Sequence, residues 1–180
     1  MTASITLHPS PSAGFDQPFE MLSACHERVS RMLALLQRLQ AHLGAGLADE
    51  PARQAARDVM RYFDQAAPHH HQDEERHVFP VLLGSSDEHL MALANRLTDD
   101  HRKMAVTWAA LRPGLEALAQ GQWAAARAEA HFAVWQAFMA LYAGHARLED
   151  EQAYPAARAQ LGPVDQAAMG EEMAKRRGVH

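Results

Sequence analysis

The chain has 180 residues, with 17 Lys and Arg, 22 Asp and Glu, 12 His and a single Cys. This length suits one domain or a small pair, and a net charge of −5 gives no basic surface for nucleic acid. A single Cys excludes a disulfide framework, and no apolar run is long enough for a signal peptide or a membrane span. We therefore expect a cytoplasmic protein with no nucleic-acid or membrane partner; a homodimer is left open. Histidine is several-fold above ordinary usage, and it is the commonest metal ligand.

Helix-forming residues dominate the chain and Val, Ile and Thr are few, which favours an all-α fold. Residues 1–15 contain several Pro and Ser and are predicted to form a flexible N-terminal arm. Apolar positions then recur at helical spacing in four stretches, over about 18–43, 52–83, 88–119 and 124–161. Within these stretches, we expect kinks or interruptions at Pro68 and at Pro113-Gly114.

Short joints separate the four helical stretches, at Gly44–Pro51, Gly84–Asp87 and Gly121–Trp123. Short connections force successive helices to lie antiparallel, so the sequence predicts an up-down-up-down four-helix bundle over residues 16–161. Gly162-Pro163 is expected to end this bundle. The remaining residues, 162–180, are predicted to form a polar C-terminal tail that is helical only in part.

An internal repeat emerges when the chain is compared with itself at an offset of 75 residues. The matching positions are His26 with His101, His70 with His145, Glu74 with Glu149, and Phe79-Pro80 with Tyr154-Pro155. The sequence therefore predicts two helical hairpins of common plan, related by a pseudo-two-fold axis.

The joints also predict the height of each histidine along the bundle. His26 and His70 are equidistant from residue 48, which lies inside the first joint. His101 and His145 are equidistant from residue 123, at the third joint, and His70 and His101 are centred on the second. All four imidazoles should therefore occupy one layer. Each Glu follows its His by four residues, one turn along the same face and about 6 Å along the axis.

Four imidazoles and two carboxylates in a bundle core predict a metal centre, because burying them without a partner would cost several kcal/mol. Nitrogen and oxygen ligands without thiolate suit iron, and suit manganese or zinc less well. We expect two iron ions, each held by two histidines and bridged by both glutamates. An oxo or hydroxo bridge would add a fifth ligand, leaving one position per ion for a small molecule. The predicted ligands are His26, His70, Glu74, His101, His145 and Glu149.

Neighbouring residues offer further candidates. His77 lies seven residues past His70, where an additional ligand or a supporting hydrogen bond would fall on nearly the same face. Tyr142 lies three residues before His145 and could donate a hydrogen bond to a bound ligand. His69 and His71 could replace His70, and Glu75 would then accompany His71. For each of these residues, an exposed position or ordinary core packing is the alternative.

The pattern His26, His70-x3-Glu74, His101, His145-x3-Glu149 on four helices resembles the hemerythrin-like, or HHE cation-binding, family. The text HHQDEERHVFPVL is similar to that family's motif on its second helix. The resemblance covers about residues 16–160. It implies a four-helix bundle with a non-haem di-iron centre bridged by two carboxylates.

Two departures from oxygen-carrying hemerythrins affect the expected function. Those proteins have a second His four residues before the third-helix His, where this chain has Leu97. They also use an Asp five residues after the last His, so Asp150 competes with Glu149, which we prefer because it preserves the repeat. The His spacing is closer to that of bacterial proteins proposed to repair iron–sulfur centres, but those carry a further Cys-containing domain.

The resemblance implies several alternative functions, all of which would use the same di-iron centre. The first hypothesis is a protein that binds a small diatomic ligand, O₂ or NO, for sensing, scavenging or storage. The alternatives are a di-iron enzyme that reduces peroxide or NO, and a protein of iron handling or iron-centre repair. A bundle with a vestigial site that serves only as an interaction module is a fourth reading. Whether the protein is an enzyme is left open by the sequence.

Overall fold

The computed structural model describes residues 14–179, and every regular element in that range is helical. The elements in chain order are α1 (Pro18–Gly44), α2 (Glu50–Arg61), a π-helical turn (Tyr62–Ala66), α3 (Ala67–His77), α4 (Phe79–Leu83), α5 (Glu88–Ala119), a 3₁₀ turn (Ala125–Arg127), α6 (Ala128–Leu148), a second π-helical turn (Glu149–Ala153), α7 (Tyr154–Gln160) and α8 (Pro163–Arg176). No helix among these is both long and apolar enough to cross a membrane. Residues 1–13 of the expected N-terminal arm lie outside the described residues.

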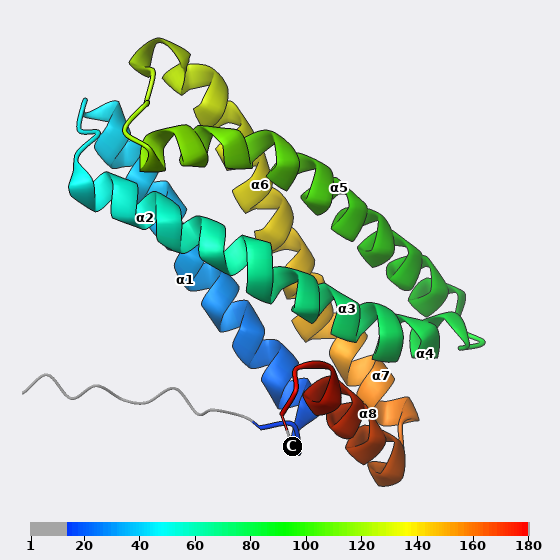
Figure 1. The fold of residues 1–180 in the computed structure, drawn as a ribbon. Helices are drawn as coiled ribbons and strands as arrows, with labels where there is room; N and C mark the ends of the chain where they lie inside the picture. The colour runs from blue at the N-terminus through cyan, green and yellow to red at the C-terminus, as the bar shows by residue number, and fades with distance from the viewer. Residues whose placement is uncertain (1–13, 180) are drawn as a thin grey trace, which may run out of the picture.

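Four long arms form the predicted bundle (Figure 1). The first is α1, the second runs from α2 to α4, the third is α5, and the fourth runs from α6 to α7. Contacts link α1 with α2, α2 with α5, α5 with α6, and α6 back to α1, so the arms close into a ring. Asp49 and Asp87 begin the second and third arms by accepting hydrogen bonds from Ala52 N and His89 N. The up-down-up-down arrangement is therefore confirmed.

Proline explains the irregular turns in two of the arms. A proline inside a helix lacks an N–H donor, and its ring crowds the carbonyl four residues earlier. Pro68 follows the first π-helical turn, Pro80 follows the break at Val78, and Pro155 follows the second π-helical turn. Pro113 differs, because α5 continues through it from Glu88 to Ala119 without interruption. The predicted interruption at Pro68 is present as a π-helical turn, and no break occurs at Pro113.

The C-terminal segment is more ordered than the sequence indicated. Residues Pro163–Arg176 form α8, whose Met169 and Met173 are buried against the base of the bundle. Figure 1 shows α8 beside α7 and the start of α1. A Cβ on Gly170 would lie 1.8 Å from the Phe15 carbonyl oxygen, so glycine is required for this close approach. The prediction of a polar, partly helical tail was wrong. Pro163 begins a further helix, a position that suits proline because the first helical N–H needs no partner within the helix.

The basic residues at the end of α8 are also structural. Arg176 and Arg177 both hydrogen-bond the carboxylate of Asp73, which is 0% exposed on α3. The sequence had placed these arginines in a polar C-terminal tail. Their long side chains instead neutralise a buried acid that would otherwise lack a partner.

Two apolar clusters make up the core, and a polar layer separates them. On α1, for example, Leu22 belongs to one cluster and Val29 to the other, with His26 between them. The same order recurs on every arm. The buried polar residues between the clusters are His26, His70, Asp73, Glu74, Asp100, His101, His145 and Glu149.

Candidate metal centre

All six residues predicted as ligands lie in the polar layer, and none is more than 6% exposed. His26 comes from α1, His101 from α5 and His145 from α6. His70 and Glu74 face inward one turn apart on α3, while Glu149 opens the second π-helical turn. The structure therefore brings all six side chains together from the four arms, at the common height that the joints predicted.

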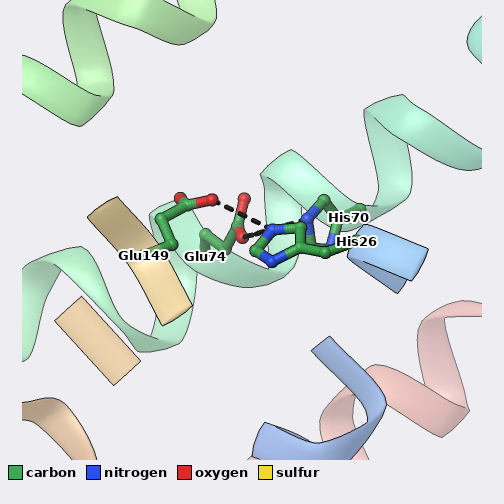
Figure 2. A group of neighbouring side chains, drawn as sticks. All are labelled: His26, His70, Glu74 and Glu149. Atoms are coloured by element: carbon green, nitrogen blue, oxygen red, sulfur yellow. Dashed lines mark hydrogen bonds and ion pairs between the residues drawn. The ribbon is translucent and has the colours of Figure 1, made fainter. Parts of the chain in front are cut away.

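The imidazole Nε2 atoms point at the two carboxylates. On single arms, His70 Nε2 lies 3.1 Å from Glu74 Oε1, and His145 Nε2 lies 3.0 Å from Glu149 Oε1. Between arms, His26 Nε2 is 3.1 Å from Glu149 Oε2 (Figure 2). His101 Nε2 is 3.4 Å from Glu74 Oε2. Each glutamate thus contacts at least one histidine from each hairpin.

The donor atoms divide into two groups of four that share both carboxylates. One group contains His26, His70, Glu74 and Glu149, and the other contains Glu74, His101, His145 and Glu149. Within each group, the candidate ligand atoms lie within 4.8 Å of one another. Two cations placed in these groups would each receive two imidazoles and would be bridged by the two glutamates.

The hydrogen bonding of the layer is incomplete without a cation. Within residues 14–179, Glu74 Oε2 and Glu149 Oε1 are buried and have no partner with hydrogen-bond geometry. The Nε2 atoms of His101 and His145 face each other at 3.0 Å, so their lone pairs can share at most one proton. Buried polar groups are normally satisfied, and a cation between these atoms would satisfy all of them. The residues therefore fit a metal centre.

Two carboxylates outside the layer orient His26 and His101, the two histidines that have no candidate ligand Glu on their own arm. His26 Nδ1 donates to Asp150 at 2.9 Å, and His101 Nδ1 donates to Glu75 at 2.8 Å. A proton held on Nδ1 leaves the Nε2 lone pair directed into the layer, which is the tautomer that binds a metal. Asp150 therefore supports His26 from outside, while Glu149 occupies the layer. The role of Glu75 was missed, although the 75-residue offset pairs it with Asp150.

The carboxylates also set the charge of these imidazoles. Burial opposes the charged form of His26, but hydrogen bonds to Asp150 and Glu149 outweigh it and raise its pKa to about 10. Burial likewise opposes the charge on His101, yet Glu74 and Glu75 raise its pKa to about 9. For His70, burial and the charge on His26 lower the pKa well below its usual value. Without a cation, positive charge is therefore favoured on His26 and His101 and disfavoured on His70.

His77 does not join the layer. Its Nε2 lies 2.7 Å from Glu172 on α8, and Glu172 also accepts from Arg76. Seven residues return the helix to nearly the same face but carry it about 10 Å along the axis. The expectation that His77 supports the centre was therefore wrong, because at that height α8 is its neighbour.

Tyr142 reaches the layer only through His71. Its hydroxyl lies 3.3 Å from His71 Nε2, and the His71 ring stacks on His101 at a centroid distance of 3.9 Å. Among the described residues, Tyr142 makes no hydrogen bond to any of the six predicted ligands. It packs instead against Phe63 and Phe138 in the apolar core. His71 lies beside the candidate ligands and is absent from both groups of donor atoms.

Tyr154 is the functional candidate that sequence reasoning missed. It is 4% exposed, and its hydroxyl donates to Glu74 Oε1 and lies 3.2 Å from His26 Nε2. Its ring stacks on that of His26 at 5.4 Å. Burial, then the charges of Glu149 and Glu74, raise the pKa of Tyr154 well above its usual value, so the phenol keeps its proton. The repeat had marked this position, but only as the aromatic before a proline.

Comparison with known proteins agrees with this geometry. Residues 17–157 match the hemerythrin HHE cation binding domain. An uncharacterised protein of Haemophilus influenzae is 30% identical over 173 residues, which cover 96% of this chain and 97% of the relative. The match to the domain spans most of the chain and includes every residue of the polar layer's two donor groups. The chain therefore belongs to the hemerythrin HHE cation-binding family.

Proposed function

We propose that the polar layer binds two iron ions and that this pair takes up a small diatomic ligand, O₂ or NO, for sensing, scavenging or storage. The proposal depends on one observation above all: two groups of buried donor atoms share Glu74 and Glu149. Two cations that share these carboxylates would lie side by side. An iron pair bound there would supply reversible ligand binding and one-electron exchange.

The donor set supports iron. It contains imidazole nitrogen and carboxylate oxygen without thiolate, and each group offers four protein donors. Iron commonly takes five or six ligands, so positions would remain beyond those four. His26, His70, His101 and His145 would hold the ions, with both glutamates between them.

Burial supports a ligand of few atoms. The six candidate ligands are at most 6% exposed, so a large substrate could not contact both cations without separating the arms. A groove of about 770 Å³ between α3, α4 and α5 reaches His71 and His101. We assign this groove as the route by which a small ligand approaches the layer.

The proposal is tested by loading the full-length chain with Fe(II) under anaerobic conditions and then adding O₂ or NO. We expect about two iron ions per chain and a new optical absorption that appears with the gas and reverses on its removal. Iron binding without any spectral change would contradict diatomic binding while leaving the metal centre intact. A chain that retains no iron would contradict both.

A second candidate, reduction of peroxide or NO at the same centre, is favoured by the Glu75–His101 hydrogen bond. Glu75 is exposed, whereas His101 is buried and faces the layer, so the pair offers a path for the protons that reduction consumes. Steady consumption of hydrogen peroxide or NO with an external reductant would identify the enzyme. A single turnover per centre would instead favour the binding protein.

A further inference from the structure

Among the repeated positions at which the two halves of the polar layer differ, one places a hydroxyl in only one half. Phe79 and Tyr154 occupy the same place in the repeat, each directly before a proline. The Phe79 ring packs against His101 with centroids 5.2 Å apart, and the Tyr154 ring packs against His26 at 5.4 Å. Both His26 and His101 thus have an aromatic ring packed against them, but only the ring against His26 carries a hydroxyl.

That hydroxyl lies among the donor atoms. Tyr154 donates to Glu74 Oε1, the oxygen that also lies 3.1 Å from His70 Nε2. The other oxygen of the same carboxylate, Oε2, faces His101 at 3.4 Å. Tyr154 therefore acts on the Glu74 oxygen directed toward His26 and His70. Phe79 has no group that could do the same for Glu149 in the other half.

We propose that Tyr154 makes the two cation positions unequal by donating its hydroxyl hydrogen bond to Glu74 on the His26–His70 side. This inference rests on the proposed di-iron function and adds a positioning residue to it. A hydrogen bond to a carboxylate oxygen withdraws electron density that the oxygen would otherwise give to a cation. The ion held by His26 and His70 is therefore the more weakly bound of the two.

The size of the effect follows from the hydrogen bond. A bond to a charged group changes an equilibrium by roughly tenfold to a hundredfold. We expect the two stepwise iron affinities of the wild-type chain to differ by about this factor. The weaker site is the one that exchanges its ion first with a chelator.

The test compares wild type with Tyr154→Phe, which gives the His26 half the same ring as the other half. Both chains are loaded with ⁵⁷Fe and studied by Mössbauer spectroscopy and by competition with a chelator. We expect two distinct iron environments in wild type and closely similar ones in Tyr154→Phe, with the stepwise affinities converging. Tyr142→Phe is the matched control, because its hydroxyl contacts His71 and no donor atom of either group; it should keep two environments.

Wild type alone can also overturn the inference, even if Tyr154→Phe does not fold. Two irons in identical environments would contradict it while leaving the di-iron function standing. A phenolate-to-iron charge-transfer band in the oxidised protein would show that Tyr154 coordinates an ion instead of donating to Glu74, and would also contradict it. Fewer than two irons per chain would overturn the proposed function itself.

Discussion

The apolar clusters and the polar layer are equally buried, yet they contribute to the fold in different ways. Leu36 and Phe138, in the apolar cluster that contains Val29, are 0% exposed and need only neighbouring apolar side chains. Glu74 and Glu149 are also 0% exposed, but oxygens of both lack hydrogen-bond partners within the described residues. The apolar clusters hold the helices together, whereas the layer needs a cation to satisfy these oxygens. Folding and cation binding should therefore respond to different substitutions.

Removing a shared carboxylate should have the largest effect. Glu74→Ala and Glu149→Ala each take an oxygen donor from both groups, so each variant should lose most of its iron. Iron per chain, measured after loading and desalting, tests this. His89→Ala is the control, because His89 is exposed and, within residues 14–179, its ring hydrogen-bonds only Gln152. Loss of iron in the control with retention in both Glu variants would refute the assignment.

A substitution in the apolar cluster that contains Val29 should destabilise the fold and leave iron binding unchanged. Phe138→Ala should lower the free energy of unfolding by about 3–5 kcal/mol, since it removes a fully buried ring and leaves a cavity. Iron per folded chain should stay at the wild-type value. Chemical denaturation together with iron analysis checks both quantities. A folded Phe138→Ala chain without iron would show that the cluster and the layer are not separable.

Cation binding should stabilise the folded chain. A ligand present at about 1,000 times its Kd adds roughly 4 kcal/mol to the free energy of unfolding. We expect thermal unfolding of the wild-type chain to shift upward with added Fe(II), and to stay unchanged in Glu74→Ala. An equal shift in both chains would place the cation outside the polar layer.

The outer carboxylates should matter less than the shared ones. Glu75→Gln weakens the hydrogen bond to Nδ1 of His101, and Asp150→Asn weakens the one to Nδ1 of His26. Neither substitution removes a donor atom from the layer. Loss of such support typically lowers metal affinity by about 10–100-fold. Glu27→Gln is the control, because Glu27 is exposed near Asp150 and, among the residues that the structure describes, pairs only with Arg31. Chelator competition measures all three affinities, and equal values would exclude this supporting role.

The smallest expected effect is the release of protons from His26 and His101 when a cation binds. The pKa of His26 is raised to about 10 and that of His101 to about 9, so both are charged at pH 7 before a cation binds. Both protons must leave, so binding should release about two protons per chain and strengthen as pH rises toward 9. In the cation-free protein, the stability gained from these charges is complete below the usual histidine pKa and is lost as pH rises through 9 to 10. Calorimetry in buffers of different ionisation enthalpy counts the protons, and zero release would contradict the assignment.

The sequence predicted the parts of the molecule that depend on spacing along a helix. Because short joints fix how antiparallel arms align, the positions of His26, His70, His101 and His145 sufficed to predict one layer. His77 was misplaced because periodicity along one helix gives a face but not the neighbour at that height. There, α8 supplies Glu172, which is 95 residues away in the chain.

Contacts between segments far apart in the chain could not be predicted from the sequence. The hydroxyl of Tyr154 reaches Glu74 across 80 residues, and Arg177 reaches Asp73 across 104. Neither pairing follows from a local pattern, because each depends on how the last helices fold back onto α3. The repeat contained part of this information, since it pairs Glu75 with Asp150 and Phe79 with Tyr154, but only the structure shows what these side chains contact.

Anomalous X-ray diffraction from crystals of the iron-loaded chain tests the central claim most directly. We expect two iron peaks per chain inside the polar layer, one near Nε2 of His26 and His70 and the other near Nε2 of His101 and His145, with Glu74 and Glu149 between them. A single peak, or peaks confined to exposed histidines such as His69 or His89, would contradict it.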